Sequence, residues 1–154
     1  KKLFFNVYGD KLDNKFKNLK NIKFYGFINY SDVPSRLSKS DLLLLPSQEV
    51  QYGRSNSVNI SNYNSPLKMF DYLAAGKVIV SSKLDGICEI LKHNQNSILV
   101  NGFEVSAWER TMKTILDKNY NLKKIRRNSL KTAKKFTWIN RVENILLAYR
   151  PLKK

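Results

Sequence analysis

The chain has 154 residues, of which 42% are hydrophobic and 26% are charged, and it contains eight Phe, eight Tyr and two Trp. A chain of this length and composition can bury a core as one globular domain, which excludes an intrinsically disordered protein. No apolar run approaches the roughly 20 residues of a membrane-spanning helix, and the chain begins without the pattern of a signal peptide. The single cysteine, Cys88, excludes an internal disulfide, so we expect a reducing, cytoplasmic location.

The net charge of +16 is the most unusual property, with 28 Lys and Arg against 12 Asp and Glu. Basic residues are dense at 11–23, at 113–135 and at 150–154. Nucleic acid, an anionic membrane surface or an anionic small substrate would each account for this charge. A coding bias toward lysine, which the seventeen asparagines favour, would account for it without a partner.

The first third of the chain predicts strands that alternate with short helical segments. Compact apolar runs predict three strands, at Leu3–Tyr8, Ile22–Phe27 and Asp41–Pro46. Between them, 11–18 can form one or two helical turns, and Ser31–Ser38 predicts a short helix. The leucine run DLLLLP is typical of a strand that is covered on both faces, as in a parallel sheet.

A long polar segment, Ser47–Asn64, follows the third strand and shows no periodicity. We interpret it as a loop, and loops of this length inside a compact domain are often functional. In an open parallel sheet, ligands bind beyond the carboxyl ends of the strands, which is where this loop begins. A tolerated surface insertion is the alternative interpretation.

The sequence SPLKMFDYLAAG predicts a short helix from Ser65 to Gly76. Asn64 or Ser65 can cap its start, Pro66 suits the first helical position, and a glycine just past the end stops it. The residues expected on its apolar face are Leu67, Phe70, Leu73 and Ala74.

The other face of this helix carries Lys68, Asp71 and Tyr72. The N–H groups of the first turn, beside Lys68, can receive an anion such as a phosphate. Asp71, one turn further along, can accept hydrogen bonds from sugar hydroxyls. A core helix with a surface Lys68–Asp71 pair is the alternative.

After this helix, two further strands are predicted at Lys77–Ser82 and Ser97–Val100, with a short helix at Gly86–Leu91 between them. Helical apolar periodicity then predicts three helices, at 105–116, 122–133 and 138–149. The whole pattern predicts an α/β fold, a Rossmann-like doubly wound parallel sheet of about five strands closed by C-terminal helices.

Three strings occur in order along the chain: NIKFYGFINYSDVPSRLSKSDLLLLPS, SPLKMFDYLAAGKVIVSSKLDGICEIL and NSILV. Together they resemble the C-terminal half of retaining glycosyltransferases with the GT-B fold, of the group 1 (family 4) type. The resemblance is greatest to the bacterial enzymes that build capsule, lipopolysaccharide and other glycans. FTWINRVENILLAY resembles the closing helix of that group.

The resemblance implies that residues 1–154 form a single domain that binds a nucleotide-diphosphate sugar donor. It also implies that the chain is a fragment of a two-domain enzyme whose N-terminal, acceptor-binding domain is absent, so that the fragment alone would be inactive. The full enzyme would transfer a sugar to an acceptor hydroxyl with retention of configuration, in the synthesis of bacterial surface glycans or glycolipids.

The resemblance also assigns roles to residues. Lys68 would lie close to the diphosphate and Asp71 would bind the ribose. The phosphate-facing turn would consist of Ser65, Pro66 and Leu67, and the residues flanking the base would be Phe27, Ile28, Pro46 and Ser47. Asp71 stands where the family usually has glutamate, and Tyr63 stands where many relatives have a glutamate near the donor sugar. Glu49, from the long loop, could take that second role.

Catalytic residues stay unknown, and relatives of this kind imply neither a metal nor a cofactor. No metal-binding spacing of His, Cys or Asp is present, and His93 is expected at the surface.

A nucleic-acid-binding module and a non-catalytic Rossmann-like module are the alternatives to a glycosyltransferase. The chain contains no nucleic-acid-binding motif, and no G-x-G-x-x-G follows the first strand, so neither alternative is supported by a motif.

For the excess charge we expect peripheral attachment to the anionic inner face of the cytoplasmic membrane, where lipid-linked acceptors reside.

Overall fold

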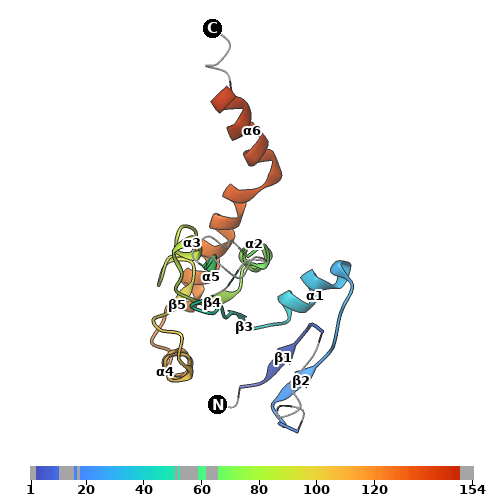
Figure 1. Ribbon diagram of the computed structural model, residues 1–154, viewed down its shortest axis with the longest axis vertical. Coiled ribbons are helices and arrows are strands. Elements are labelled where there is room, and N and C mark those ends of the chain that lie inside the picture. Colours follow the sequence, from blue (N-terminus) through green and yellow to red (C-terminus); the bar gives the residue numbers. More distant parts are fainter. Residues whose placement is uncertain are drawn as a thin grey trace. The chain divides into compact units, whose positions relative to one another are not determined.

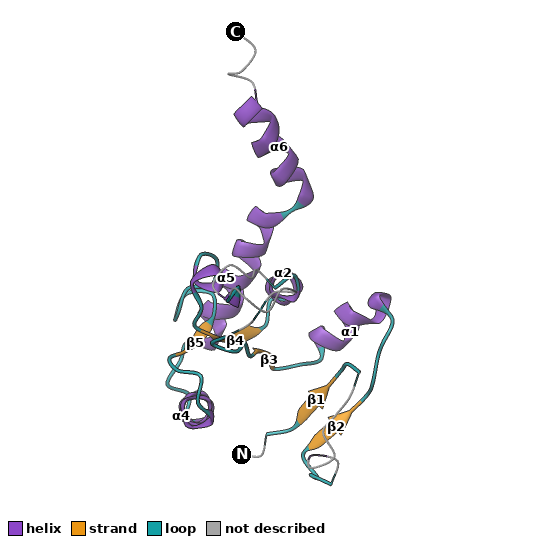
Figure 2. Ribbon diagram, viewed as in Figure 1, coloured by secondary structure: helices purple, strands orange, loops and turns teal. Residues whose placement is uncertain are grey.

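The computed structural model describes residues 3–10, 16, 18–50, 52, 59–61 and 66–149 (Figures 1 and 2). Five strands and the helices between and after them form an α/β fold. The strands are β1 (Phe5–Val7), β2 (Ile22–Phe24), β3 (Leu42–Leu45), β4 (Val78–Ser82) and β5 (Ile98–Val100). The helices are η2 (Tyr30–Asp32), α1 (Val33–Ser38), α2 (Lys68–Ala74), α3 (Asp85–Cys88), α4 (Val105–Leu116), α5 (Leu122–Ala133), η4 (Lys134–Phe136) and α6 (Trp138–Tyr149). The chain divides into two compact units, Lys1–Lys39 and Ser40–Lys154.

In the first unit, β1 pairs with β2 in parallel, with Phe5 opposite Ile22. The rings of Tyr8 and Tyr25, just beyond the two strands, stack with centroids 4.9 Å apart. The Arg36 guanidinium of α1 lies 5.5 Å from the centre of the Tyr25 ring. Aromatic stacking and a cation–π contact therefore tie α1 to the end of this small sheet.

In the second unit, β3, β4 and β5 form a parallel sheet with β4 in the middle. Val80 of β4 lies opposite Leu44 on one side and Ile98 on the other. Every residue of β4 is buried, as expected for an apolar run in the centre of a parallel sheet. Parallel pairing within each sheet and the helices between the strands confirm the predicted Rossmann-like α/β class, but the five strands form a two-stranded and a three-stranded sheet.

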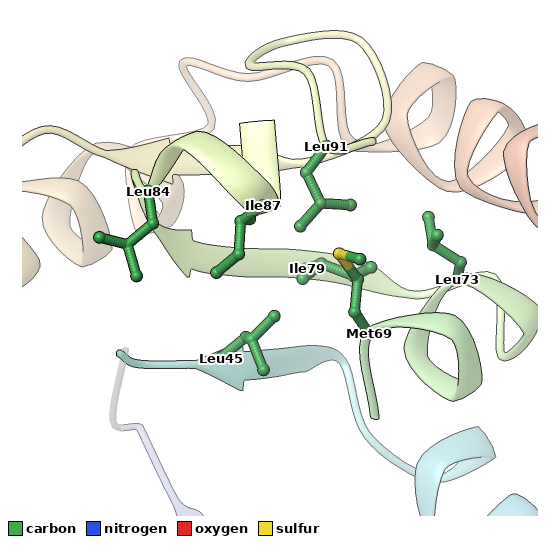
Figure 3. Close-up of a cluster of buried hydrophobic side chains, with 7 residues drawn as sticks. All are labelled: Leu45, Met69, Leu73, Ile79, Leu84, Ile87 and Leu91. Atoms are coloured by element: carbon green, nitrogen blue, oxygen red, sulfur yellow. The ribbon is translucent and has the colours of Figure 1, made fainter. Parts of the chain in front are cut away.

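Two apolar cores cover the two faces of this sheet, because successive side chains of a strand point to opposite faces. The first core lies between the sheet and helices α2 and α3, and Figure 3 shows its side chains gathered around β4. It consists of Leu45, Met69, Leu73, Ile79, Leu84, Ile87 and Leu91. The second core lies on the face covered by α4 and α5 and consists of Val78, Val80, Ile98, Val100, Ala107, Ile115 and Ile125.

The apolar face predicted for the helix after the long loop is confirmed for two of its four residues. Leu73 is fully buried and Phe70 packs against the first core, but Leu67 is 82% exposed and Ala74 is exposed, and the fully buried Met69 was not predicted. The reason is that α2 begins at Lys68, so Leu67 is the residue before the first helical turn and does not share its docking face. Met69 and Leu73 are four residues apart, the spacing that places two side chains on one helix face.

The predicted stop of α2 is confirmed. Gly76 has φ +63°, a left-handed conformation that favours glycine, and its N–H donates to the Leu73 carbonyl oxygen at 3.1 Å. The three helices predicted after β5 are also confirmed at 105–116, 122–133 and 138–149. Of these, α4 and α5 bury residues against the sheet, but α6 buries none, so it does not close the fold as expected. None of the helices in the described part of the chain combines the length and apolar character that crossing a bilayer requires.

We predict that Gly76→Ala destabilises the second unit for two reasons. A residue with a side chain is strained at the positive φ of this position, and the added Cβ would lie 2.7 Å from Cγ of Leu130. The expected loss in the free energy of unfolding is about 1–3 kcal/mol, measured by urea denaturation. Gly76→Ala combined with Leu130→Ala should recover the steric part of the loss and keep the part due to backbone strain. A Gly76→Ala variant as stable as the wild type would contradict this prediction.

Candidate functional site

The carboxyl edge of the second sheet is polar and internally hydrogen-bonded. β3 and β4 are parallel, so the chain leaves both strands at the same edge. The Oγ of Ser82, at the end of β4, accepts from the Ser47 N–H at 2.8 Å and donates to the Ser47 carbonyl oxygen at 3.0 Å. Ser82 is fully buried. This pair of hydrogen bonds, the serine clip, attaches the start of the long loop to the central strand.

A second buried serine holds the far part of the same loop. The Oγ of Ser61, which is 1% exposed, donates to the Glu49 carbonyl oxygen at 2.8 Å. The Ser61 N–H donates to Oδ1 of Asn59 at 3.0 Å, and Asn59 forms an antiparallel bridge with Tyr52. The described residues 59–61 are therefore tied back to the first part of the same loop.

The first turn of α2 lies after this loop in the chain. The carbonyl oxygens of Pro66 and Leu67 accept from the N–H groups of Met69 and Phe70 at 2.9 and 3.0 Å, which makes a tight start to the helix. Leu67 and Lys68 are exposed and Pro66 is half-buried. Of the residues predicted to face a phosphate, the structure thus places Pro66, Leu67 and Lys68 in one turn. Ser65 lies outside the described residues, as do Asn64 and Tyr63.

Asp71 ends the first turn of α2 and Tyr72 follows it, and both are half-buried. Burial raises the pKa of the Tyr72 hydroxyl above its ordinary value of 10.0, and the negative charge of Asp71 raises it further. Tyr72 is therefore a neutral hydroxyl at physiological pH, next to a carboxylate that can accept hydrogen bonds. The sequence predicted Tyr72 on the polar face of the helix, but the structure packs its partly buried side chain against the first core.

The remaining predicted residues lie on other segments. Phe27, which is 79% exposed, and Ile28, which is half-buried, follow β2 in the first unit. In the second unit, Pro46 is exposed and Ser47 is half-buried within the serine clip. The side chain of Glu49 is exposed, four residues after β3 ends.

The buried serines were missed by sequence reasoning. The available signal was that the apolar strand VIVSS ends in two serines, and that buried hydroxyls need hydrogen-bond partners. Their partners are backbone groups 35 residues away in the chain for Ser82 and 12 residues away for Ser61.

His93 is exposed, as predicted, and has a structural role. Its Nδ1 accepts from the Leu99 N–H at 3.0 Å, and its ring meets the Tyr120 ring edge-on with centroids 6.0 Å apart. Within the ranges that the structure describes, no three His, Cys, Asp or Glu residues are grouped so that they could hold a metal ion.

Comparison with known proteins identifies the family. The model of the family "Glycosyl transferases group 1" matches residues 8–136, so the chain belongs to the group 1 glycosyl transferases. No curated protein sequence matches the chain.

Solved structures share the fold. The Anabaena protein HepE in complex with UDP matches with 20% identity and a TM-score of 0.67, over 95% of this chain and 41% of that chain. HepE in complex with UDP-glucose also matches. A glycosyltransferase from Rickettsia africae matches with 17% identity and a TM-score of 0.71, over 99% of this chain and 41% of that chain.

A shorter structure matches over less of the chain. It is the C-terminal domain of LpcC, a glycosyl transferase group 1 family protein from Francisella tularensis, with 20% identity and a TM-score of 0.55. This match covers 79% of the present chain and 58% of that chain. The chain therefore spans less than half the length of the HepE and Rickettsia chains, and its fold is that of GT-B glycosyltransferases.

We predict that the serine clip stabilises the second unit. Ser82→Ala leaves the Ser47 N–H without its acceptor, which should lower the free energy of unfolding by about 1–3 kcal/mol. Ser81→Ala is the matched control, because Ser81 is equally buried but its Oγ only donates, to carbonyl oxygens of the strands. Its expected loss is about 1 kcal/mol or less. Equal losses for the two variants in urea denaturation would show that the clip adds nothing.

The raised pKa of Tyr72 predicts a loss of stability at high pH. Below the ordinary tyrosine pKa both states hold the proton, and stability is complete. As pH rises from about 9 to about 11, the unfolded chain releases this proton first, so folding becomes less favourable. Tyr72→Phe removes the group that titrates. Urea denaturation should therefore show a smaller fall in the free energy of unfolding of this variant between pH about 9 and about 11 than in the wild type. Parallel falls in the two proteins would contradict the assignment.

Proposed function

We propose that this chain binds a nucleotide-diphosphate sugar, and that the longer enzyme of which it is a part transfers the sugar to an acceptor hydroxyl with retention of configuration. The family match carries this proposal, because it spans 8–136 and includes every residue given a donor-binding role. The structures of HepE with UDP and with UDP-glucose support the choice of donor class.

The first turn of α2 would bind the diphosphate. Lys68 lies in this turn, and its side chain is exposed. The positive charge of Lys68 and the partially positive N-terminal end of the helix both attract an anion, and backbone N–H groups beside Lys68 can donate to it. The same groups would stabilise the negative charge that develops on the departing nucleotide diphosphate, which is the electrostatic part of the rate enhancement.

Asp71 would accept hydrogen bonds from the ribose hydroxyls. Its side chain is one methylene shorter than the usual glutamate, so the ribose must approach α2 more closely or be reached through water. The neighbouring Tyr72 hydroxyl, which stays protonated, can donate to the same ligand. Phe27, Ile28, Pro46 and Ser47 are proposed to flank the base, and Glu49 and Tyr63 to face the donor sugar. No metal or cofactor is part of this proposal.

A nucleotide titration tests the donor site. UDP or GDP should bind at least about tenfold more tightly than UMP or GMP, because only the diphosphates reach Lys68. Lys68→Ala should remove the preference for diphosphates, and Asp71→Ala should weaken all four nucleotides. Lys123→Ala and Asp117→Ala are the controls, since they make the same charge changes at exposed positions, in α5 and directly after α4. Isothermal calorimetry that shows no diphosphate preference, or no effect of either site variant, would contradict the proposal.

We also propose that the enzyme acts in bacterial surface-glycan synthesis, in the cytoplasm and peripherally on the inner membrane face. The charge of +16 supports this location, and α5 presents a basic surface made of Lys123, Lys124, Arg127 and Lys131, all exposed. Each such residue near an anionic bilayer contributes about 1 kcal/mol.

The protein should therefore co-sediment with phosphatidylglycerol vesicles but not with phosphatidylcholine vesicles. Changing Lys123, Lys124 and Lys131 together to Gln should weaken this binding. If the fraction of protein that sediments did not change with the phosphatidylglycerol content of the vesicles, the membrane proposal would be contradicted. The proposed donor site would not be affected by that result.

A further inference from the structure

The turn that follows β5 contains the only Asn-Gly pair of the chain, Asn101–Gly102. Asn101 is exposed, and its side-chain amide makes no hydrogen bond with the part of the chain that the structure describes. The Gly102 N–H likewise donates to none of the described backbone carbonyl groups. The amide carbon of Asn101 and the backbone nitrogen of Gly102 are therefore both free to react.

The backbone of this turn requires glycine at position 102. Its φ is +123°, a conformation that residues with a side chain rarely adopt, and an added Cβ would lie 2.5 Å from Oε2 of Glu104. A side chain at this position would also shield the nitrogen of its own residue. The glycine that the turn needs thus leaves this nitrogen open to the side chain that precedes it.

Two similar pairs, Asn96–Ser97 and Asn128–Ser129, are held by hydrogen bonds. Asn96 is 5% exposed, its amide donates to the Ile90 carbonyl oxygen at 2.9 Å, and its Oδ1 accepts from the Lys92 N–H at 2.7 Å. Asn128 lies within α5, and its amide donates to the Gln95 carbonyl oxygen at 2.9 Å. These two amides must first leave their partners by local opening, which the exposed asparagine after β5 does not need.

We propose that Asn101 deamidates spontaneously in the folded chain and is thus a site of self-modification. The Gly102 nitrogen attacks Cγ of Asn101, the new N–Cγ bond closes a five-membered succinimide ring, and the Cγ–Nδ2 bond breaks. The departing amide takes up the hydrogen that the Gly102 nitrogen loses and leaves as ammonia. Water then opens the ring at either carbonyl group, which yields aspartate or isoaspartate. No oxidation or reduction occurs, so water is the one co-reactant.

Both products alter the carboxyl edge of the second sheet. Val100, just before Asn101, ends β5 and lies opposite Ser82, whose hydroxyl holds Ser47 beyond β3. Aspartate adds a negative charge at this edge, and isoaspartate also lengthens the backbone by one carbon atom. Neighbouring strands are about 5 Å apart, so the new charge lies about 10 Å from the end of β3, a distance close to the screening length of about 8 Å at physiological salt.

The new charge should weaken the binding of an anion at this edge. This consequence rests on the proposed function, in which the anion is a nucleoside diphosphate. Deamidation should lower the affinity for UDP about twofold at physiological ionic strength and about fivefold at low salt, where the charge is less screened.

Peptide mass spectrometry of the 154-residue chain tests the modification. Trypsin releases residues 93–110 as one peptide, which contains Asn94, Asn96 and Asn101 and therefore carries its own controls. Asn94 precedes a residue with a side chain, and Asn96 is held by hydrogen bonds. After incubation of the folded chain at physiological pH and temperature, Asn101 should become acidic at least about tenfold faster than either.

The product identifies the route, because only ring opening of the succinimide yields isoaspartate. Isoaspartate should appear at position 101 and should be absent in Asn101→Gln, whose longer side chain would have to close a six-membered ring. Equal rates at the three asparagines, or aspartate without isoaspartate, would overturn the proposal.

A parallel incubation in urea tests whether the fold permits the attack. The rate at Asn101 in the folded chain should be within about threefold of the rate in the unfolded chain, whereas Asn96 should react faster once it is unfolded. A reaction at Asn101 that occurs only in urea would overturn the proposal.

Asn101→Asp tests the effect on the donor site, because it adds the charge without the isomerised backbone. Calorimetry should show the expected loss of UDP affinity in this variant. Asn119→Asp is the matched control, since it makes the same charge change at an exposed position beyond the end of α4, and it should leave the affinity unchanged. Equal affinities of the two variants for UDP would overturn the effect on the donor site.

The two readouts separate this inference from the proposed function. Isoaspartate at position 101 in a chain without any diphosphate preference would support the modification and contradict the donor site. A preference for diphosphates in a chain that forms no isoaspartate would overturn the modification alone.

Discussion

The packing of strand β4 on both of its faces is the constraint on which the second unit depends. Its five residues are all buried, and the side chains of Val78 and Val80 enter one core while Ile79 enters the other. A strand in this position needs neighbours on both edges and helices on both faces, since the burial of large apolar side chains is the main favourable term in folding. α2 is held by Met69 and Leu73 in the core that contains Ile79. The position of the candidate site therefore follows from how β4 is buried.

The change from apolar to polar residues within β4 explains how a packed core ends in a polar edge. The strand finishes with two serines, and a buried hydroxyl must find a hydrogen-bond partner. Ser82 finds it in the backbone of Ser47, so the residue that completes the strand also fixes the first residues of the loop. Ser61 donates to the Glu49 carbonyl oxygen and so joins two described parts of the loop to each other. The first residue of the loop is thus held against the central strand by the hydroxyl of Ser82. A residue held in this way can face a ligand without a large ordering cost on binding.

The sequence predicts the element order well because each element has a local signal. Apolar runs mark the strands, and Gly76 marks the end of α2 because its left-handed conformation is a local requirement. The side of α2 that faces the core could not be predicted reliably. α2 begins at Lys68 and not at Ser65, so Leu67 lies outside the helix, and the buried position before Leu73 is taken by Met69, four residues earlier. The hydrogen bonds of Ser82 and Ser61 depend on partners far away in the chain, so no local pattern specifies them.

Periodicity in α6 correctly indicates an amphipathic helix, but it does not say whether the rest of the same chain covers the apolar side. Lys68 and Asp71 were identified from their residue types and spacing, and the structure places both in the first turn of α2.

Amide chemical-shift mapping with UDP and UMP most directly tests whether the carboxyl edge of the second sheet binds the donor. The account predicts that UDP shifts the amide resonances of Leu67, Lys68 and Asp71, and that UMP leaves Lys68 much less affected because it lacks the second phosphate. It also predicts shifts at Ser47, at the start of the loop. Shifts that instead follow the basic residues of α5, with equal response to both nucleotides, would show that nucleotides bind this chain through its general charge and would contradict the donor site.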